Sequence, residues 1–236
     1  MSIVQPPVVK SIMAIAAHPD DIESWCAGTL VLAHARGAKV RLLLVTSGEH
    51  GTSDSHVPAQ QVALQREREA RSAAEILGIS EIAFLHYPDG DVEDTHTLRG
   101  QLVEYIRRWR PDVLFTHDPE HPYPAYTTHR DHRIVGRVAL DAVYPLARDR
   151  LAFSEQIRAG LSTHIVREVW LFSSLNADSY IDISNGFERK VEARLAHISQ
   201  TSDSSALRTG WHERFTVIGQ QVGLSLAEAF VILKLE

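Results

Sequence analysis

Strand-like and helix-like patterns alternate through the first half of this chain, and no other feature constrains its fold as much. Four short apolar runs typical of buried strands lie at Ser11–Ala17, Lys39–Thr46, Glu81–His86 and Val113–His117. Three longer segments with helical spacing separate them, at Ile22–Arg36, Gln60–Leu77 and Thr97–Arg110. Strands and helices in this order form a parallel sheet covered on both faces. We therefore predict an α/β fold with a mostly parallel sheet, in one domain over residues 1–236.

The second half gives a weaker pattern. A helix is predicted from Thr128 to about Tyr144, two strands at Glu168–Ser173 and Ser179–Ile183, and a helix at Phe187–Ser199. Residues 146–166 and the C-terminal segment 201–236 show no pattern that assigns their packing.

The composition excludes several classes of protein. Of the 236 residues, 44% are hydrophobic and 23% are charged, which indicates a globular chain and excludes a disordered one. With 24 basic and 30 acidic side chains the net charge is −6, so we expect no nucleic-acid partner. The single cysteine, Cys26, excludes an intramolecular disulfide and a cysteine-based zinc site. No run approaches the roughly 20 apolar residues of a membrane span, and MSIVQPPVVK lacks a signal-peptide core, so we expect a cytoplasmic protein.

Polar or ionisable side chains follow four successive predicted strands. In parallel sheets, ligands bind beyond the carboxyl ends of the strands, where these side chains would meet. After the first strand comes His18-Pro19-Asp20-Asp21, and Pro19 favours extended geometry at His18. Asp20 and Glu23 also fit a capping box at the start of the next helix, which is the structural alternative. A histidine with a carboxylate three residues later is equally half of a metal site.

A second cluster, His129-Arg130-Asp131-His132, precedes the predicted helix that begins at Thr128. His129 and His132 are three residues apart and share one helical face. Two histidines exposed to solvent on the first turn of the helix would show the same spacing. Catalytic zinc takes three protein ligands and one water, and His18, Asp21 and His132 supply such a set.

These two motifs, AHPDDIE at residues 17–23 and HRDH at 129–132, resemble the signatures of the PIG-L/LmbE family of zinc-dependent N-acetylglucosaminyl deacetylases. Supporting matches are Thr46–Glu49, Arg66–Glu69, Tyr87–Gly90 and Lys190–Gln200, so that the resemblance covers roughly residues 10–200. Arg130 departs from the proline that many members carry there. The resemblance implies a Rossmann-like sheet, one Zn²⁺ per chain, and a homo-oligomer such as a trimer or hexamer.

Carried over residue by residue, the resemblance implies His18, Asp21 and His132 as zinc ligands. It implies Asp20 as the general base, His129 as the group that stabilises the oxyanion in its protonated form, and Asp131 as the residue that orients a histidine.

The resemblance also suggests which residues bind the substrate. Glu49, Arg66 and Asp89 match family positions that contact sugar hydroxyls, although Arg66 and Glu69 also fit a solvated helix pair. The implied activity is hydrolysis of an N-acetyl or other N-acyl group on a glucosamine-containing small molecule. An amidase acting on a thiol conjugate or antibiotic intermediate, and a non-catalytic sugar- or metal-binding module, remain the alternatives.

Overall fold

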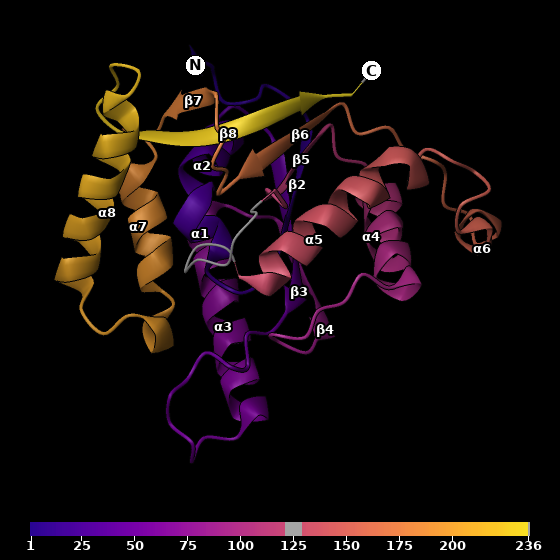
Figure 1. Cartoon of the computed structure of the whole chain (residues 1–236), viewed down its shortest axis with the longest axis horizontal. Helices are drawn as coiled ribbons and strands as arrows, with labels where there is room; N and C mark the ends of the chain where they lie inside the picture. The colour runs from indigo at the N-terminus through magenta and orange to yellow at the C-terminus, as the bar shows by residue number, and fades with distance from the viewer. Residues whose placement is uncertain (121–128, 236) are drawn as a thin grey trace.

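The computed structural model describes residues 1–120 and 129–235, and its centre is one sheet with the strand order β1-β7-β8-β6-β5-β2-β3-β4 (Figure 1). The strands are β1 (Ser2–Ile3), β2 (Ser11–Ala16), β3 (Lys39–Thr46), β4 (Glu81–Tyr87), β5 (Val113–His117), β6 (Glu168–Phe172), β7 (Ser179–Asp182) and β8 (Ala227–Lys234). The helices are α1 (Asp21–Trp25), α2 (Ala27–Ala35), α3 (Ala59–Leu77), α4 (His96–Trp109), α5 (Arg130–Asp141), the π-helical turn η1 (Ala142–Leu146), α6 (Ser154–Arg158), α7 (Phe187–Leu195), the 3₁₀ turn η2 (Ile198–Gln200) and α8 (Ser204–Gln220). The predicted fold class is confirmed.

The five strands β6, β5, β2, β3 and β4 are parallel, and they place their carboxyl ends at one edge of the sheet. From β2 the chain moves outward to β3 and β4, then returns to the other side of β2 as β5. This reversal of strand order opens a crevice between the ends of β2 and β5, which is where open α/β sheets bind ligands.

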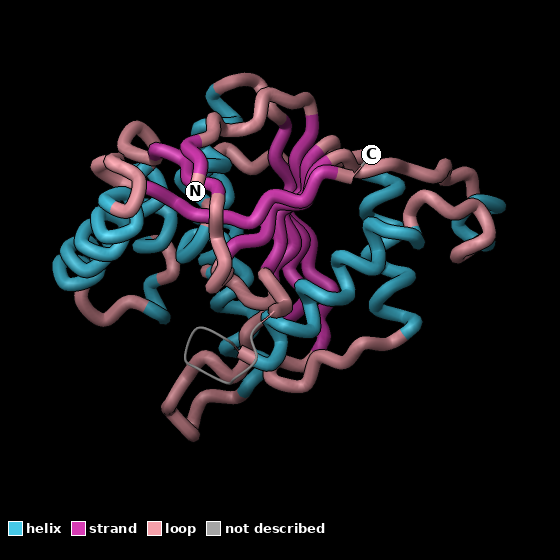
Figure 2. Tube along the Cα trace, turned by 45° about the horizontal axis from the view of Figure 1, so that its top comes forward, coloured by secondary structure: helices cyan, strands magenta, loops and turns pink. Residues whose placement is uncertain are grey.

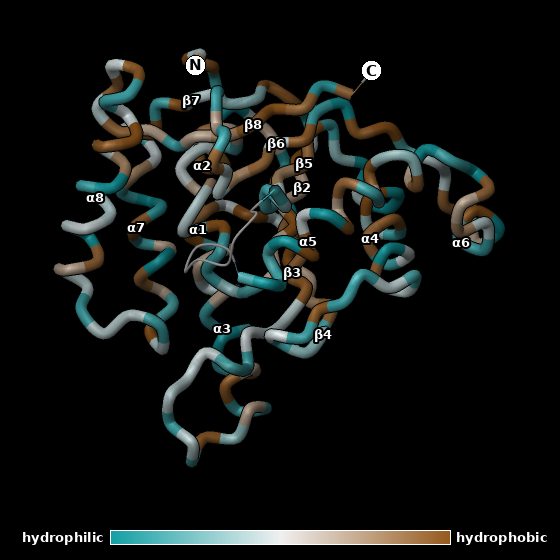
Figure 3. Tube along the Cα trace, in the orientation of Figure 1, coloured by the Kyte–Doolittle hydropathy of each residue, from teal (hydrophilic) through white to brown (hydrophobic). Residues whose placement is uncertain are grey.

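Helices cover both faces of the sheet (Figure 2), and β2 shows why. From Ile12 to Ala16 its side chains alternate between the faces and are fully buried on both, so neither face of this strand can be left to solvent. Ile12, Ala14 and Ala16 pack in the cluster that includes side chains of α2, α3, α7 and α8. Met13 and Ile15 pack in the cluster that includes side chains of α4 and α5. Figure 3 accordingly shows the central strands in hydrophobic colours.

Three predicted helices differ in the structure. The helix predicted at Phe187–Ser199 ends at Leu195 as α7, and the separate turn η2 follows it. The helix predicted over 22–36 is broken at Cys26, so that α1 and α2 are separate helices. The predicted start at Thr128 lies outside the described residues, and His129 is the N-cap of α5.

The C-terminal segment that the sequence left unassigned forms α8 and β8. Strand β8 lies between β6 and β7 and is antiparallel to both. Its Glu228 is fully buried and bonds to Lys190 of α7 and to the first turn of α2. The end of the chain therefore holds the helices next to the crevice in place.

Segment 146–166 is organised by one buried side chain, Arg107 of α4. Its guanidinium donates hydrogen bonds to the carbonyl oxygens of Leu146, Ala147, Asp149, Ala152 and Phe153 and to Oε1 of Gln156.

Candidate metal centre

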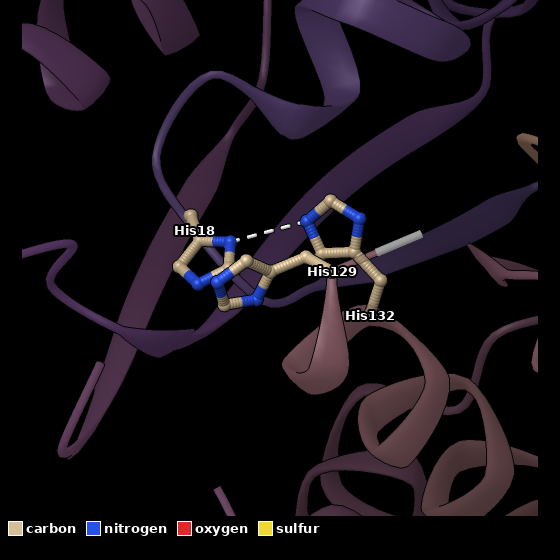
Figure 4. A group of neighbouring side chains, drawn as sticks. All are labelled: His18, His129 and His132. Carbon is tan, nitrogen blue, oxygen red and sulfur yellow. Dashed lines mark hydrogen bonds between the residues drawn. The ribbon is translucent and has the colours of Figure 1, made fainter. Parts of the chain in front are cut away.

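The crevice between β2 and β5 brings together three side chains from two distant motifs. His18 follows β2, Asp21 opens α1, and His132 lies in the first turn of α5. His18 Nδ1 is 3.2 Å from His132 Nε2, which is 3.1 Å from Asp21 Oδ1, and Asp21 Oδ2 is 3.5 Å from His18 Nδ1. A tetrahedral ion with bonds of about 2.0–2.1 Å separates its ligand atoms by about 3.3 Å, so these residues fit a divalent cation. Figure 4 shows His18 and His132 converging from opposite sides.

Local geometry aims these side chains. The backbone N–H of His18 donates a hydrogen bond to Asp21 Oδ2 at 2.8 Å, which fixes that carboxylate beside the His18 imidazole. A Cβ added at Gly136 would lie 2.4 Å from the His117 carbonyl oxygen. A residue without a side chain therefore lets α5 approach the end of β5 and carry His132, one turn earlier, into the crevice.

Two carboxylates lie on the other side of the His18 ring. Asp89 Oδ1 is 3.0 Å and Asp131 Oδ2 is 3.4 Å from His18 Nε2. Burial acts to lower the pKa of His18, but the carboxylates of Asp131, Asp21 and Asp89 outweigh it and raise that pKa well above its usual value. A carboxylate on the outer nitrogen of a metal-binding imidazole orients the ring and strengthens it as a ligand.

His117 is a residue that the sequence did not rank as a site residue, and it is fully buried against the ligand set. Its ring stacks on His132 with centroids 4.1 Å apart, and its Nε2 accepts from the Ala17 N–H at 3.2 Å. Burial, followed by repulsion from His132, lowers the pKa of His117 to about 3. One potential ligand atom from each of Asp21, His117 and His132 lies within 4.8 Å of the other two, so His117 is also close enough to contact an ion.

Asp20 has a strained backbone and two cationic neighbours. Its φ is 89°, and its side chain makes no cap hydrogen bond, so the capping-box alternative is wrong. Asp20 Oδ1 lies 3.2 Å from Arg66 Nη2 and Oδ2 lies 3.5 Å from Arg194 Nη2. Burial raises the pKa of Asp20, and the two guanidinium groups offset part of that rise. Non-glycine strain of this kind concentrates at functional sites.

His129 and Asp131 are arranged differently from the expectation. The Asp131 N–H donates to His129 Nδ1 at 3.2 Å, whereas the carboxylate of Asp131 stays 3.9 Å from that nitrogen. The carboxylate instead accepts from the N–H groups of Gly90 and Val92. Burial and the nearby His18 lower the pKa of His129, which favours a neutral ring. Asp131 therefore contacts His18 more closely than His129.

The three expected substrate-binding residues lie at the same edge. The Asp89 N–H donates to Glu49 Oε1 at 2.9 Å, and Asp89 Oδ2 accepts from the His50 N–H. Arg66 is buried and donates to the carbonyl oxygens of Gly48 and Pro19.

The alternative of a solvated Arg66–Glu69 pair is wrong, because both residues are buried and have other partners. Glu69 accepts from both the N–H and the hydroxyl of Ser199.

A cavity of about 280 Å³ opens over the cluster, lined by His18, Asp20, His50, Gly51, Arg66, Asp89, His129 and Gln200. The Gln200 amide donates to the Gly51 carbonyl oxygen at 2.8 Å and so joins η2 to the loop after β3.

The sequence did not predict His50 and Arg194 as site residues, although Arg194 lies inside the Lys190–Gln200 match. Among the described residues, no helix is long and apolar enough to cross a bilayer.

Comparison with known proteins identifies the family of the chain. The PIG-L family, described as GlcNAc-PI de-N-acetylase, matches residues 13–143. The diacetylchitobiose deacetylase of Thermococcus kodakarensis is 34% identical over 192 residues, which is 81% of this chain and 70% of that protein. The mycothiol S-conjugate amidase of Streptomyces coelicolor is 30% identical over 153 residues, which is 56% of this chain and 50% of that protein.

The structure of N,N'-diacetylchitobiose deacetylase from Pyrococcus horikoshii superimposes with a TM-score of 0.89 at 26% identity, covering 95% of this chain and 84% of that one. The family match spans more than half of the chain and contains both motifs that build the crevice, and the two deacetylases extend the likeness to most of its length. The chain therefore belongs to the PIG-L family of metal-dependent hydrolases, enzymes that cleave carbon–nitrogen amide bonds of sugar derivatives.

Proposed function

We propose that this protein is a zinc-dependent deacetylase that hydrolyses the N-acetyl group of a small N-acetylglucosamine-containing saccharide. The observation that carries the proposal is the convergence of His18 Nδ1, His132 Nε2 and the Asp21 carboxylate, with Asp20 nearby and held by two arginines. A binding module needs ligands but no additional base, so the placement of Asp20 supports catalysis. Diacetylchitobiose is the first substrate to test, because two of the similar proteins are diacetylchitobiose deacetylases.

His18, Asp21 and His132 would hold the ion, and their two nitrogens and one oxygen suit Zn²⁺. A bound Zn²⁺ supplies Lewis acidity, which lowers the pKa of water to about 7 and polarises an amide carbonyl.

The residues around the ion have separate tasks in this proposal. Asp20 accepts a proton from the attacking water and delivers it to the departing amine, so that water and amide yield acetate and a free amine. His129 Nδ1 accepts a backbone hydrogen bond, so the neutral ring carries its proton on Nε2 and can donate it to the developing oxyanion. Asp131 and Asp89 hold His18 from its outer nitrogen.

The test combines metal analysis with acetate release from N-acetylglucosamine and N,N'-diacetylchitobiose. We expect one zinc per chain and activity that a chelator abolishes. His132→Ala should lose the metal, whereas Asp20→Asn should keep it and lose turnover by about 10²-fold or more. His56→Ala, at an exposed histidine, is the matched control and should change neither. Unchanged turnover in Asp20→Asn would remove the assigned base.

A further inference from the structure

A second cavity, of about 330 Å³, lies between α8, the end of α1 and the segment that joins β6 to β7. None of the residues that line it lines the cavity over the metal centre. Its walls include Trp25, Phe215, Ile218 and Leu175, which are apolar or aromatic. Its volume is at the low end of the range for small-molecule sites, so any ligand would be small.

Arg214 of α8 is the one charged side chain among the described residues that line this cavity. Its guanidinium lies over the Trp25 ring, with Cζ 4.1 Å from the ring centroid, and 5.2 Å from the centroid of Phe215. Across the described part of the chain, Arg214 has neither a carboxylate within ion-pair distance nor a hydrogen-bond acceptor. This half-buried guanidinium therefore keeps its N–H donors available to water or to an anion in the cavity.

Ser173 is a second polar residue in the lining of the same cavity. It follows β6 directly with φ of 59°, which is uncommon for a residue with a side chain. Its Oγ is buried and has no hydrogen-bond partner within residues 1–120 and 129–235. A guanidinium without a protein acceptor and an unpartnered hydroxyl therefore belong to the lining of one cavity with apolar walls and no lining carboxylate, among the described residues.

We propose that this cavity binds a small organic anion whose carboxylate or phosphate group is held by Arg214 and Ser173. The body of the ligand is aromatic or aliphatic and packs on Trp25 and Ile218. Guanidinium groups recognise both oxyanions through paired N–H donors, and stacking on Trp25 holds the guanidinium flat. The site is independent of the hydrolysis at the metal centre.

Phenylacetate and phenyl phosphate are suitable probes, with 2-phenylethanol as the neutral match. We expect calorimetry on the zinc-loaded protein to show one probe bound per chain in addition to any bound at the metal, with quenching of Trp25 fluorescence. The relative heats of the two anions distinguish a carboxylate site from a phosphate site. Arg214→Gln should weaken binding at least tenfold and Arg214→Lys should restore part of it.

Anions also bind metal ions, so the two sites are separated with variants. His132→Ala should leave the Arg214-dependent binding intact, and Trp25→Phe should remove the quenching while binding remains. Ser173→Ala provides a second variant if Arg214→Gln does not fold, and it should weaken both anions without changing turnover. Equal affinity of wild type and Arg214→Gln, loss of all binding in His132→Ala, equal binding of 2-phenylethanol, or no binding at millimolar probe would each overturn the proposal.

Discussion

The buried ion pair between Lys190 and Glu228 allows a quantitative test of how the C-terminal strand supports the site. Lys190 Nζ lies 2.6 Å from Glu228 Oε1, and both side chains are fully buried. The carboxylate also accepts from the N–H groups of Gly28 and Thr29 and from the Thr29 hydroxyl. Lys190→Met removes the positive charge but leaves the carboxylate buried at the first turn of α2.

Breaking one side of a buried pair costs about 3–5 kcal/mol. Three remaining donors and the positive end of α2 still stabilise Glu228, so we expect the lower part of that range. For a chain of this size, about 3–5 kcal/mol corresponds to a fall in Tm of about 6–20 °C. Urea unfolding followed by circular dichroism gives the free energy, and calorimetry gives Tm.

The matched control is Lys39→Met, at an exposed lysine, which should change stability by less than about 0.5 kcal/mol. Lys190→Met combined with Glu228→Gln removes the unpaired charge and should recover about 1 kcal/mol relative to Lys190→Met alone. If Lys190→Met unfolds within 1 kcal/mol of wild type, or if the double variant is the less stable of the two, the argument from unpaired buried charge is refuted.

Four further predictions concern the site and its surroundings. Arg194→Gln should lower kcat roughly tenfold to a hundredfold with KM and zinc content unchanged, and Arg194→Lys should recover part of the rate; equal kcat values would show that this contact with Asp20 is not needed. Arg107→Met leaves six acceptors without their donor and should lower the free energy of unfolding in urea by about 3 kcal/mol or more. A variant as stable as the wild type would contradict this prediction. His117 has a pKa of about 3 in the folded protein against about 6.5 in the unfolded chain, so it binds fewer protons when folded. In metal-free protein the free energy of unfolding should therefore fall by about 1.4 kcal/mol per pH unit as the pH falls from about 6.5 towards 3. His117→Gln should remove this contribution to the pH dependence. Chelation should lower Tm, and zinc should restore it. At a hundredfold excess over Kd, zinc should raise the free energy of unfolding by about 2.7 kcal/mol, and an unchanged Tm would argue against a bound ion.

The predicted strands agree with the structure because burial on both faces gives β2, β3 and β5 largely apolar runs, and the half-buried edge strand β4 keeps an apolar stretch at Ile82–Leu85. β3 and β5 have the predicted bounds, and β2 and β4 differ by one residue. Strand β8 escaped prediction because Glu228 interrupts its apolar run as a solvent-facing residue would. Its partner Lys190 is 38 positions away and identifiable only in the fold.

The break between α1 and α2 has the same origin. The apolar spacing of 22–36 continues through Cys26, so the sequence alone favours one helix. The Glu228 carboxylate accepts from the N–H groups of Gly28 and Thr29, and a helix starting at Ala27 leaves those two groups free to donate. A cap that comes from 200 residues later in the chain leaves no local signal.

The role of Asp20 shows most clearly what local sequence cannot decide. Asp20 followed by Glu23 has the pattern of a capping box, and that reading is chemically sound within four residues. Capping requires extended backbone at the cap residue, whereas Asp20 has φ of 89° and directs its carboxylate to Arg66 and Arg194. The strain persists because the ion pairs with those arginines, from α3 and α7, stabilise this conformation and not the capped one. The choice between a helix cap and a candidate base therefore depends on side chains 46 and 174 positions away, which the packing of α3 against α7 brings to the same place.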